Sequence, residues 1–320
     1  MTWVYIAISA YFLAALNSVI DKYILKSSVS KPLVYAFYVG LFSIFSIALT
    51  PFGFEWPGFV QFGSAIFAGM VFLLALISFF TVLRVSDVSR VVSIVGGVTP
   101  IFILLLSSII FGSVLSINEY YALIFLITGT ILISIQHNPK FSIFQIHKHS
   151  FIRNTEVAVL SAFLFALFFV SAKYVFENQA FISGFVWTRI GSFIAALSIL
   201  LIPSVRKSIF YTTKAVGIKV RYLFVVNKTL AGISFFMLNY SIAIGNATLV
   251  NALGGVKYVF LLVLVFFLSV LRPNILHEEF SLFIIFQKSS AIVLIFFGIL
   301  ILSGYSFPDF SSLIKYISFN

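Results

Sequence analysis

The sequence predicts an all-α polytopic membrane protein whose ten transmembrane helices form two inverted five-helix repeats. Three observations lead to this prediction. The chain is strongly apolar, with a mean hydropathy of +1.15 and 9% charged residues, against about 25% in soluble domains. Its apolar residues fall into ten runs, each near the roughly 20 residues that a helix needs to cross a bilayer. The runs of the first half reappear, in the same order, in the second half.

The ten runs define the expected spans. In chain order they cover residues 3–21, 33–50, 59–83, 91–112, 120–136, 156–176, 181–203, 222–244, 247–270 and 284–305. The two longest connections, around 137–155 and 204–221, are polar and basic. The first run lacks the basic leading segment of a cleavable signal peptide. We therefore expect a first five-helix repeat (1–137), a basic cytoplasmic linker (138–155), a second five-helix repeat (156–305) and a C-terminal tail (306–320).

The repeat is visible as matched residues in the two halves. Residues 74–80 read LALISFF and residues 230–236 read LAGISFF. Further matches, in the same order, are Lys22 with Lys173, Gly40 with Gly191, Gly96-Gly97-Val98 with Gly254-Gly255-Val256, Ala122 with Ala291 and Gly129 with Gly298. Chance similarity between apolar segments would not preserve this order or match Lys, Gly and Ser. Because five is odd, the second copy enters the membrane in the opposite direction, and a pseudo-twofold axis in the membrane plane relates the halves.

The distribution of Lys and Arg predicts the orientation. The connections after odd-numbered spans hold Lys22, Lys26, Lys31, Arg84, Arg90, Lys140, Lys148, Arg153, Arg206, Lys207, Lys214, Lys219, Arg221 and Arg272. Lys288, at the start of the tenth span, lies on the same side, whereas the opposite side has only Lys315. Because basic loops stay in the cytoplasm, we expect the odd connections to be cytoplasmic and both termini to be external.

This arrangement of ten spans in two halves resembles the drug/metabolite transporter superfamily, specifically its EamA-like permeases, over nearly the whole chain. The strongest local match is Ser78–Pro100, which ends in Gly96-Gly97-Val98-Thr99-Pro100. Two features depart from the family pattern: Gly112-Ser113 stands where a Gly-Glu pair often ends the fourth span, and family members usually keep both termini in the cytoplasm. The resemblance implies a multi-pass transporter of the cell membrane, monomeric or homodimeric, that moves a small metabolite.

Charged residues inside the spans point to the charge of the expected substrate. Lys173, Arg189, Lys228 and Lys257 lie within runs, and no acid lies well inside one. An ionisable group at membrane depth costs about 2.5–3.5 kcal/mol on insertion scales and marks a functional site by default. A bound anion is the simplest partner, so we expect an anionic or zwitterionic small-molecule substrate.

Lys257 is the sharpest candidate for a substrate-binding residue. It lies about ten residues into the ninth span, roughly 15 Å deep at 1.5 Å per residue. The stretch Gly254–Val259 is similar to the lysine-bearing ninth span of sugar-phosphate and nucleotide-sugar members of the superfamily. The resemblance implies that Lys257 contacts a substrate phosphate. The alternative is a lysine that pairs with helix-end carbonyls or a water pocket.

Other polar residues in the spans are further candidates. Lys228 and Asn239 are eleven residues apart, which is close to a whole number of helical turns, so they share a helix face that Phe235 joins. The alternative is that the Lys228 side chain extends to the cytoplasmic interface. Arg189, beside Trp187, offers a planar fork for carboxylate or phosphate, or for carbonyls of a neighbouring helix.

Four more polar residues have two possible roles each. Asn17 and Asn251 could bind substrate or join helices. Lys22 and Lys173 are interface anchors or gate residues, and Lys173 can pair with Glu177 one turn on.

The chain shows no pattern of an enzyme. It has no Cys, and its four His residues fall in connections without metal-ligand spacing, so we expect no metal and no cofactor. The positive charge is explained by topology rather than by nucleic acid. We expect alternating-access transport, with a site near the midplane between spans one, three, four, six, eight and nine. The alternatives are a lipid-phosphate flippase, whose groove would be open between two helices, and a non-transporting membrane assembly factor.

Overall fold

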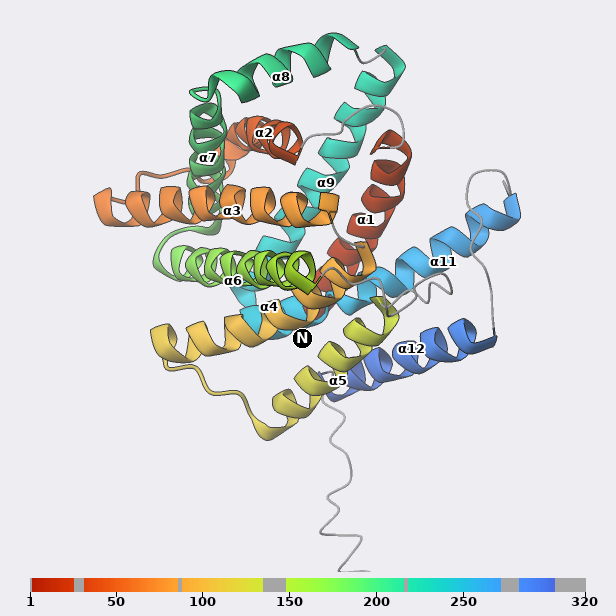
Figure 1. The fold of residues 1–320 in the computed structure, drawn as a ribbon. Helices are drawn as coiled ribbons and strands as arrows, with labels where there is room; N and C mark the ends of the chain where they lie inside the picture. Colours follow the sequence, from red (N-terminus) through yellow and green to blue (C-terminus); the bar gives the residue numbers. More distant parts are fainter. Residues whose placement is uncertain are drawn as a thin grey trace, which may run out of the picture.

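The computed structural model describes residues 2–25, 32–85, 88–134, 148–215, 218–271 and 282–302 (Figure 1). These residues form helices joined by short connections, with no strand among them. The elements are α1 (Thr2–Leu25), α2 (Pro32–Phe42), the 3₁₀ helix η1 (Ser43–Phe52), α3 (Phe59–Val85), α4 (Val88–Phe111), α5 (Ile117–Ser134), α6 (Lys148–Asn178), α7 (Phe181–Ile199), α8 (Pro203–Ala215), α9 (Ile218–Ile244), α10 (Ala247–Ala252), α11 (Gly255–Leu271) and α12 (Leu282–Leu302).

Membrane-spanning length and composition confirm an integral, multi-pass helical membrane protein. Nine helical segments of the described chain are long and apolar enough to cross a bilayer. The tenth expected span corresponds to α12, whose apolar stretch Phe286–Leu302 is shorter. Two expected connections are partly helical: α6 begins at Lys148, inside the expected linker, and residues 203–215 form α8. The remaining residues of the expected linker and the C-terminal tail lie outside the described residues.

Two expected spans are not continuous α-helices. The second span changes from α2 to the 3₁₀ helix η1, which contains Pro51 and is capped by Gly53 with a φ of 111°. A 3₁₀ stretch of ten residues is unusual, because its hydrogen bonds are poorer than those of an α-helix. The ninth span is interrupted at Leu253-Gly254, between α10 and α11. Adjacent glycines at 254 and 255 disfavour a continuous helix there.

Helices from the two halves of the chain pack on each other in matching pairs. The first helix α1 packs on α9, and its sequence counterpart α6 packs on α3. Repeat-matched serines join both pairs. Ser234 Oγ of α9 donates to the carbonyl of Ala10 at 2.8 Å, and Ser78 Oγ of α3 donates to that of Val157 at 3.4 Å. Each half therefore contributes its third span to the partner half.

The pair α5 and α12, side by side in Figure 1, packs through matched glycines. A Cβ on Gly129 would lie 3.1 Å from the carbonyl oxygen of Ala291, and a Cβ on Gly298 would lie 3.2 Å from that of Ala122. As the residue number rises along α5, the number of its partner on α12 falls, so the two helices run antiparallel. Small residues allow this close approach of backbones.

Candidate functional site

A cavity of about 430 Å³ lies between α2, η1, α3, α7 and α9. Most of its lining is apolar, with aromatic side chains from all of these elements. Its polar lining residues are Arg189 on α7, Lys228 and Thr229 on α9, and Ser43 and Ser46 on η1. A mostly apolar cavity with a few polar groups is typical of a small-molecule site.

The crossing of α3 and α7 positions Arg189. Gly69 and Gly191 lie so close to the facing backbone that any Cβ would overlap it. Ser192 Oγ donates to the carbonyl of Gly69 at 2.9 Å and fixes the register of the two helices. Phe72, one turn beyond Gly69, then lies beside Arg189. The small residues of α7 thus hold the arginine at a fixed place in the cavity wall.

The Arg189 guanidinium is buried in a cage of aromatic rings. The residue is 6% exposed. Its Cζ lies 4.5 Å from the ring centroid of Phe72 and 4.4 Å from that of Phe235, with Phe185 at 5.8 Å and Phe168 at 5.9 Å. Cation–π contacts of this kind contribute roughly 0.5–2 kcal/mol each and do not use the hydrogen-bond donors.

Two donors of Arg189 lack partners. Nε and Nη2 are buried and find no hydrogen-bond acceptor in the described part of the chain, and the hydroxyl of Ser46, another lining residue, also has no partner there. Leaving such a group unpaired costs about 1–3 kcal/mol, and more when it is charged. Arg189 therefore brings to the cavity wall a positive charge whose Nε and Nη2 have no acceptor among the described residues. This chemistry suits a carboxylate or a phosphate.

Lys228 forms one end of the cavity. Its ammonium donates to the Tyr35 hydroxyl on α2 and lies 4.6 Å from the centre of the same ring and 5.3 Å from that of Phe224. Phe224 in turn packs edge-on against Phe42, 5.7 Å away. These side chains bridge α2 and α9 between the cavity and the basic connections of the chain.

Phe236 separates the cavity from a second hollow. Its ring packs against Phe181 at 5.3 Å and Phe185 at 5.2 Å. On the far side lies an open hollow, also of about 430 Å³, lined by Glu55, Phe181 and Tyr240 among others, and Phe236 lines both spaces. The aromatic group of Phe181, Phe185 and Phe236 is therefore the wall between the Arg189 cavity and this hollow.

The structure brings together two of the predicted substrate residues, Arg189 and Lys228, and places the others outside this cavity. Lys257 is half-buried in the first turn of α11, and Asn17 is half-buried on α1. Asn251 donates to the carbonyl of Ala247 at 2.9 Å.

Asn239 and Trp187 also point elsewhere. Asn239 is 1% exposed and donates to the carbonyl of Phe235 at 2.8 Å, so its amide supports α9 rather than the cavity. Trp187 packs against Phe54 and, edge to face, against Trp56 and Phe62, and its Nε1 donates to the carbonyl of Glu55 at 3.5 Å.

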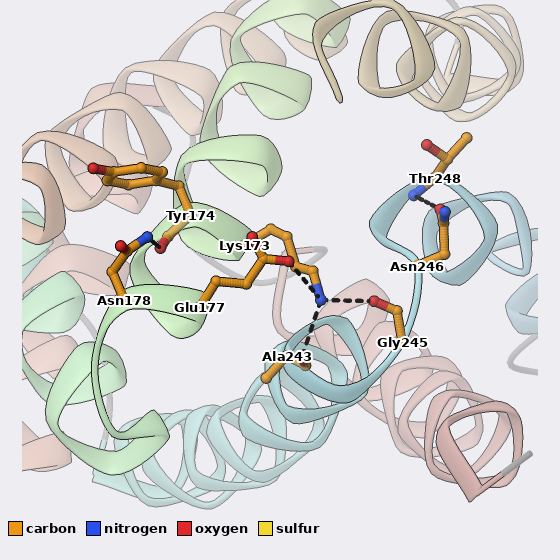
Figure 2. A network of polar contacts seen from close by, with 8 residues as sticks. All are labelled: Lys173, Tyr174, Glu177, Asn178, Ala243, Gly245, Asn246 and Thr248. Carbon is orange, nitrogen blue, oxygen red and sulfur yellow. Dashed lines mark hydrogen bonds and ion pairs between the residues drawn. The ribbon is translucent and has the colours of Figure 1, made fainter. Parts of the chain in front are cut away.

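Lys173 caps the end of α9. Figure 2 shows its ammonium between the carbonyls of Ala243 and Gly245, both 3.0 Å away, with Glu177 at 3.3 Å. Asn246 then accepts from the amide of Thr248 and starts α10. A lysine that meets the last carbonyls of a helix also complements the helix dipole. The side chain of Lys22, its repeat counterpart, lies outside the described residues.

Sequence reasoning missed the aromatic cage, Ser46 and Tyr35. Phenylalanines are so frequent in this chain, 41 in all, that the few around Arg189 carry no separate signal. Across the described residues, no three His, Asp or Glu side chains gather as a metal site would require.

Comparisons with known proteins bear on the fold alone. No protein-family model matches the chain, and no curated protein matches it. Among solved structures, the chain is similar to a crystal structure described only as "Crystal structure of protein", with a TM-score of 0.64 and 15% sequence identity. The match covers 94% of this chain and 95% of the other. The two proteins therefore share a fold over nearly their whole lengths.

Proposed function

We propose that this protein is a secondary transporter of a small organic anion, built as two inverted repeats of the drug/metabolite transporter type. The observation that carries the proposal is Arg189, which is 6% exposed, lines a cavity at membrane depth and has two donors without an acceptor among the described residues. Arg189 lies eight residues into α7, about 12 Å along its axis, near the middle of a bilayer. A charge held there with two donors unpaired among the described residues is explained by a ligand that meets it.

Matched packing supports the inverted repeat. Counterpart helices form counterpart pairs, α1 with α9 and α6 with α3. A twofold axis that relates two antiparallel helices must run across them, and α5 and α12 are antiparallel with reciprocal glycine contacts. For helices that cross a membrane, such an axis lies in the membrane plane.

The closed ends of the cavity support alternating access. The Lys228–Tyr35 pair lies toward the basic connections, and Phe236 lies toward the hollow beside Glu55. On the charge-based orientation, these ends face the cytoplasm and the exterior, respectively. Opening each end in turn would expose Arg189 to one side at a time.

Thermal stabilisation of the purified protein tests the proposal. We would screen inorganic phosphate, a sugar phosphate, mono- and dicarboxylates and matched cations, because a ligand of the native state at 100 times its Kd adds about 2.7 kcal/mol of stability. Anions should stabilise the wild type and Arg189→Lys to some degree, but not Arg189→Gln. Arg206→Gln, which removes an exposed base of α8, is the matched control and should behave as wild type.

The same variants separate the two cationic candidates. Lys257→Gln should keep the anion response, because Lys257 does not line the cavity. An anion response that depends on Lys257 and not on Arg189 would move the site to α11. A response to cations alone would contradict the proposal.

A further inference from the structure

One wall of the Arg189 cavity is also the outer surface of the molecule. Phe45 and Ile233 line the cavity and are 69% and 50% exposed, and Thr229, Gly232 and Ala48 beside them are exposed as well. A Cβ on Gly232 would meet nothing within 4 Å. These residues define the η1–α9 seam, which is an opening between two helices.

The packing of the two helices explains why the seam is open. The 3₁₀ helix η1 packs on α7 and continues from α2, while α9 packs on α1. Under the proposed repeat, the contact of α2 and η1 with α9 is the counterpart of the contact of α7 with α3. Gly69 and Gly191 bring α3 and α7 into close contact. In the counterpart contact, between η1 and α9, Phe45 and Ile233 remain exposed. The opening is thus a local departure from the repeat.

The seam opens toward hydrocarbon rather than water. Gly232 lies ten residues into the span Tyr222–Ile244, about 15 Å along its axis. That depth is near the centre of a bilayer whose core is about 30 Å thick. A fully hydrated anion has no route through this opening, whereas a molecule dissolved in the bilayer does.

We propose that the cavity binds an anionic amphiphile drawn laterally from the membrane. The proposal rests on the transport function argued above and names its substrate class. The phosphate or carboxylate head pairs with the positive charge of Arg189 in the cavity wall, and the apolar part passes over Gly232 and out through the η1–α9 seam. Each methylene that stays among apolar groups avoids the cost of exposure to water.

Binding of dodecyl phosphate to the protein in neutral phosphatidylcholine nanodiscs tests this inference. Empty nanodiscs correct for partition of the probe into lipid. The comparison probes are inorganic phosphate, which has the head alone, and dodecyltrimethylammonium, which has the chain with the opposite charge. We expect dodecyl phosphate to bind at least tenfold more tightly than inorganic phosphate, and the cation to show no saturable binding.

Two glycine substitutions isolate the seam. Gly232→Trp should fill the opening and weaken dodecyl phosphate binding at least tenfold, as should Arg189→Gln. Gly63→Trp is the matched control, because Gly63 is an exposed helical glycine of α3 whose added Cβ also meets nothing within 4 Å. It should bind as wild type, and equal melting temperatures of the two Trp variants show that Gly232→Trp is folded.

Three outcomes would overturn the inference. Inorganic phosphate could bind as tightly as dodecyl phosphate, with binding lost in Arg189→Gln and unchanged in Gly232→Trp. In that case the anion transporter stands and lateral access is wrong. Equal binding of the cationic amphiphile shows unspecific uptake of chains. Dodecyl phosphate binding that survives Arg189→Gln removes the assigned anion site, and with it the proposed function.

Discussion

At the scale of single residues, Arg189 combines features that a purely structural arginine avoids. Structural arginines inside proteins form ion pairs or bind carbonyls, because an unpaired buried charge is costly. Here the guanidinium carbon lies over the rings of Phe72 and Phe235, and Nε and Nη2 have no acceptor in the described part of the chain. The arrangement fixes the position of the charge, as a binding site for the proposed anion would require.

Arg189→Met tests this reading through stability. The substitution keeps a long flexible side chain and removes two unpaired donors, so the ligand-free variant should melt at or above the temperature of the wild type. Replacing buried charges by apolar groups is often neutral or stabilising by about 1–4 kcal/mol. Differential scanning fluorimetry in detergent measures the difference. A clear fall in melting temperature would mean that the guanidinium supports the fold rather than a ligand.

At the scale of helices, the protein relies on side chains that bind the backbone of a neighbouring helix. Ser192 donates to Gly69, Tyr11 donates to Val250 at 2.9 Å, and Gln287 donates to Leu132 at 2.8 Å. In lipid, where apolar burial does not drive helix association, such bonds and close packing of small residues do so. These contacts hold the framework in which α3 and α7 present the cavity.

Lys173 provides the sharpest test at this scale. Lys173→Met leaves the carbonyls of Ala243 and Gly245 without their donor and should lower the free energy of unfolding by about 1.5–3 kcal/mol, the range for hydrogen bonds to charged groups. Glu177→Gln removes only a half-exposed ion pair and should cost at most about 1 kcal/mol. Thermal melting compares both with wild type. Equal losses would show that the ion pair, and not the cap of α9, dominates.

The helices differ in how well the sequence predicts them. Uniform spans such as α3 and α7 follow from hydropathy. The change from α2 to η1 does not, because a 3₁₀ segment has no hydropathy signal of its own. Helix α8 lies in a segment expected to be a polar connection, yet Val205 and Ile209 are buried against α2 and α7 while Arg206 is exposed.

The candidate site was predicted only in part, for a related reason. Charge inside a span singled out Arg189 and Lys228 as isolated residues, because desolvation makes any such charge expensive. Their meeting in one cavity depends on the angle between α7 and α9, and on η1 standing away from α9. Asn239 lies on the predicted face, but its amide donates to the carbonyl of Phe235 in its own helix. Such a bond forms within one helix and does not require a second helix. The sequence of a single helix therefore shows which polar residues share a face. Which of these residues come together in one cavity depends on how the helices of the two halves pack.

At the scale of the whole molecule, the basic connections and the proposed repeat together predict on which side of the membrane each connection lies. Three spans separate the α4–α5 connection from the α7–α8 connection, so the two must lie on opposite sides of the membrane. The absence of Cys from the chain allows single cysteines to report on this without a background. Val114 and Leu201, in these two connections, are each 82% exposed and are matched labelling positions.

We expect an impermeant maleimide to label Val114→Cys on intact cells and to label Leu201→Cys only after permeabilisation. The reason is the positive-inside rule, under which the bases of α8 should keep the Leu201 side in the cytoplasm. Mass shift on a denaturing gel measures the labelled fraction, and both variants should label fully in detergent. The reverse pattern would place both termini in the cytoplasm and exchange the two faces of the cavity, so that Phe236 would close the cytoplasmic end. Labelling of both positions on intact cells would break the odd spacing of spans on which the inverted repeat depends.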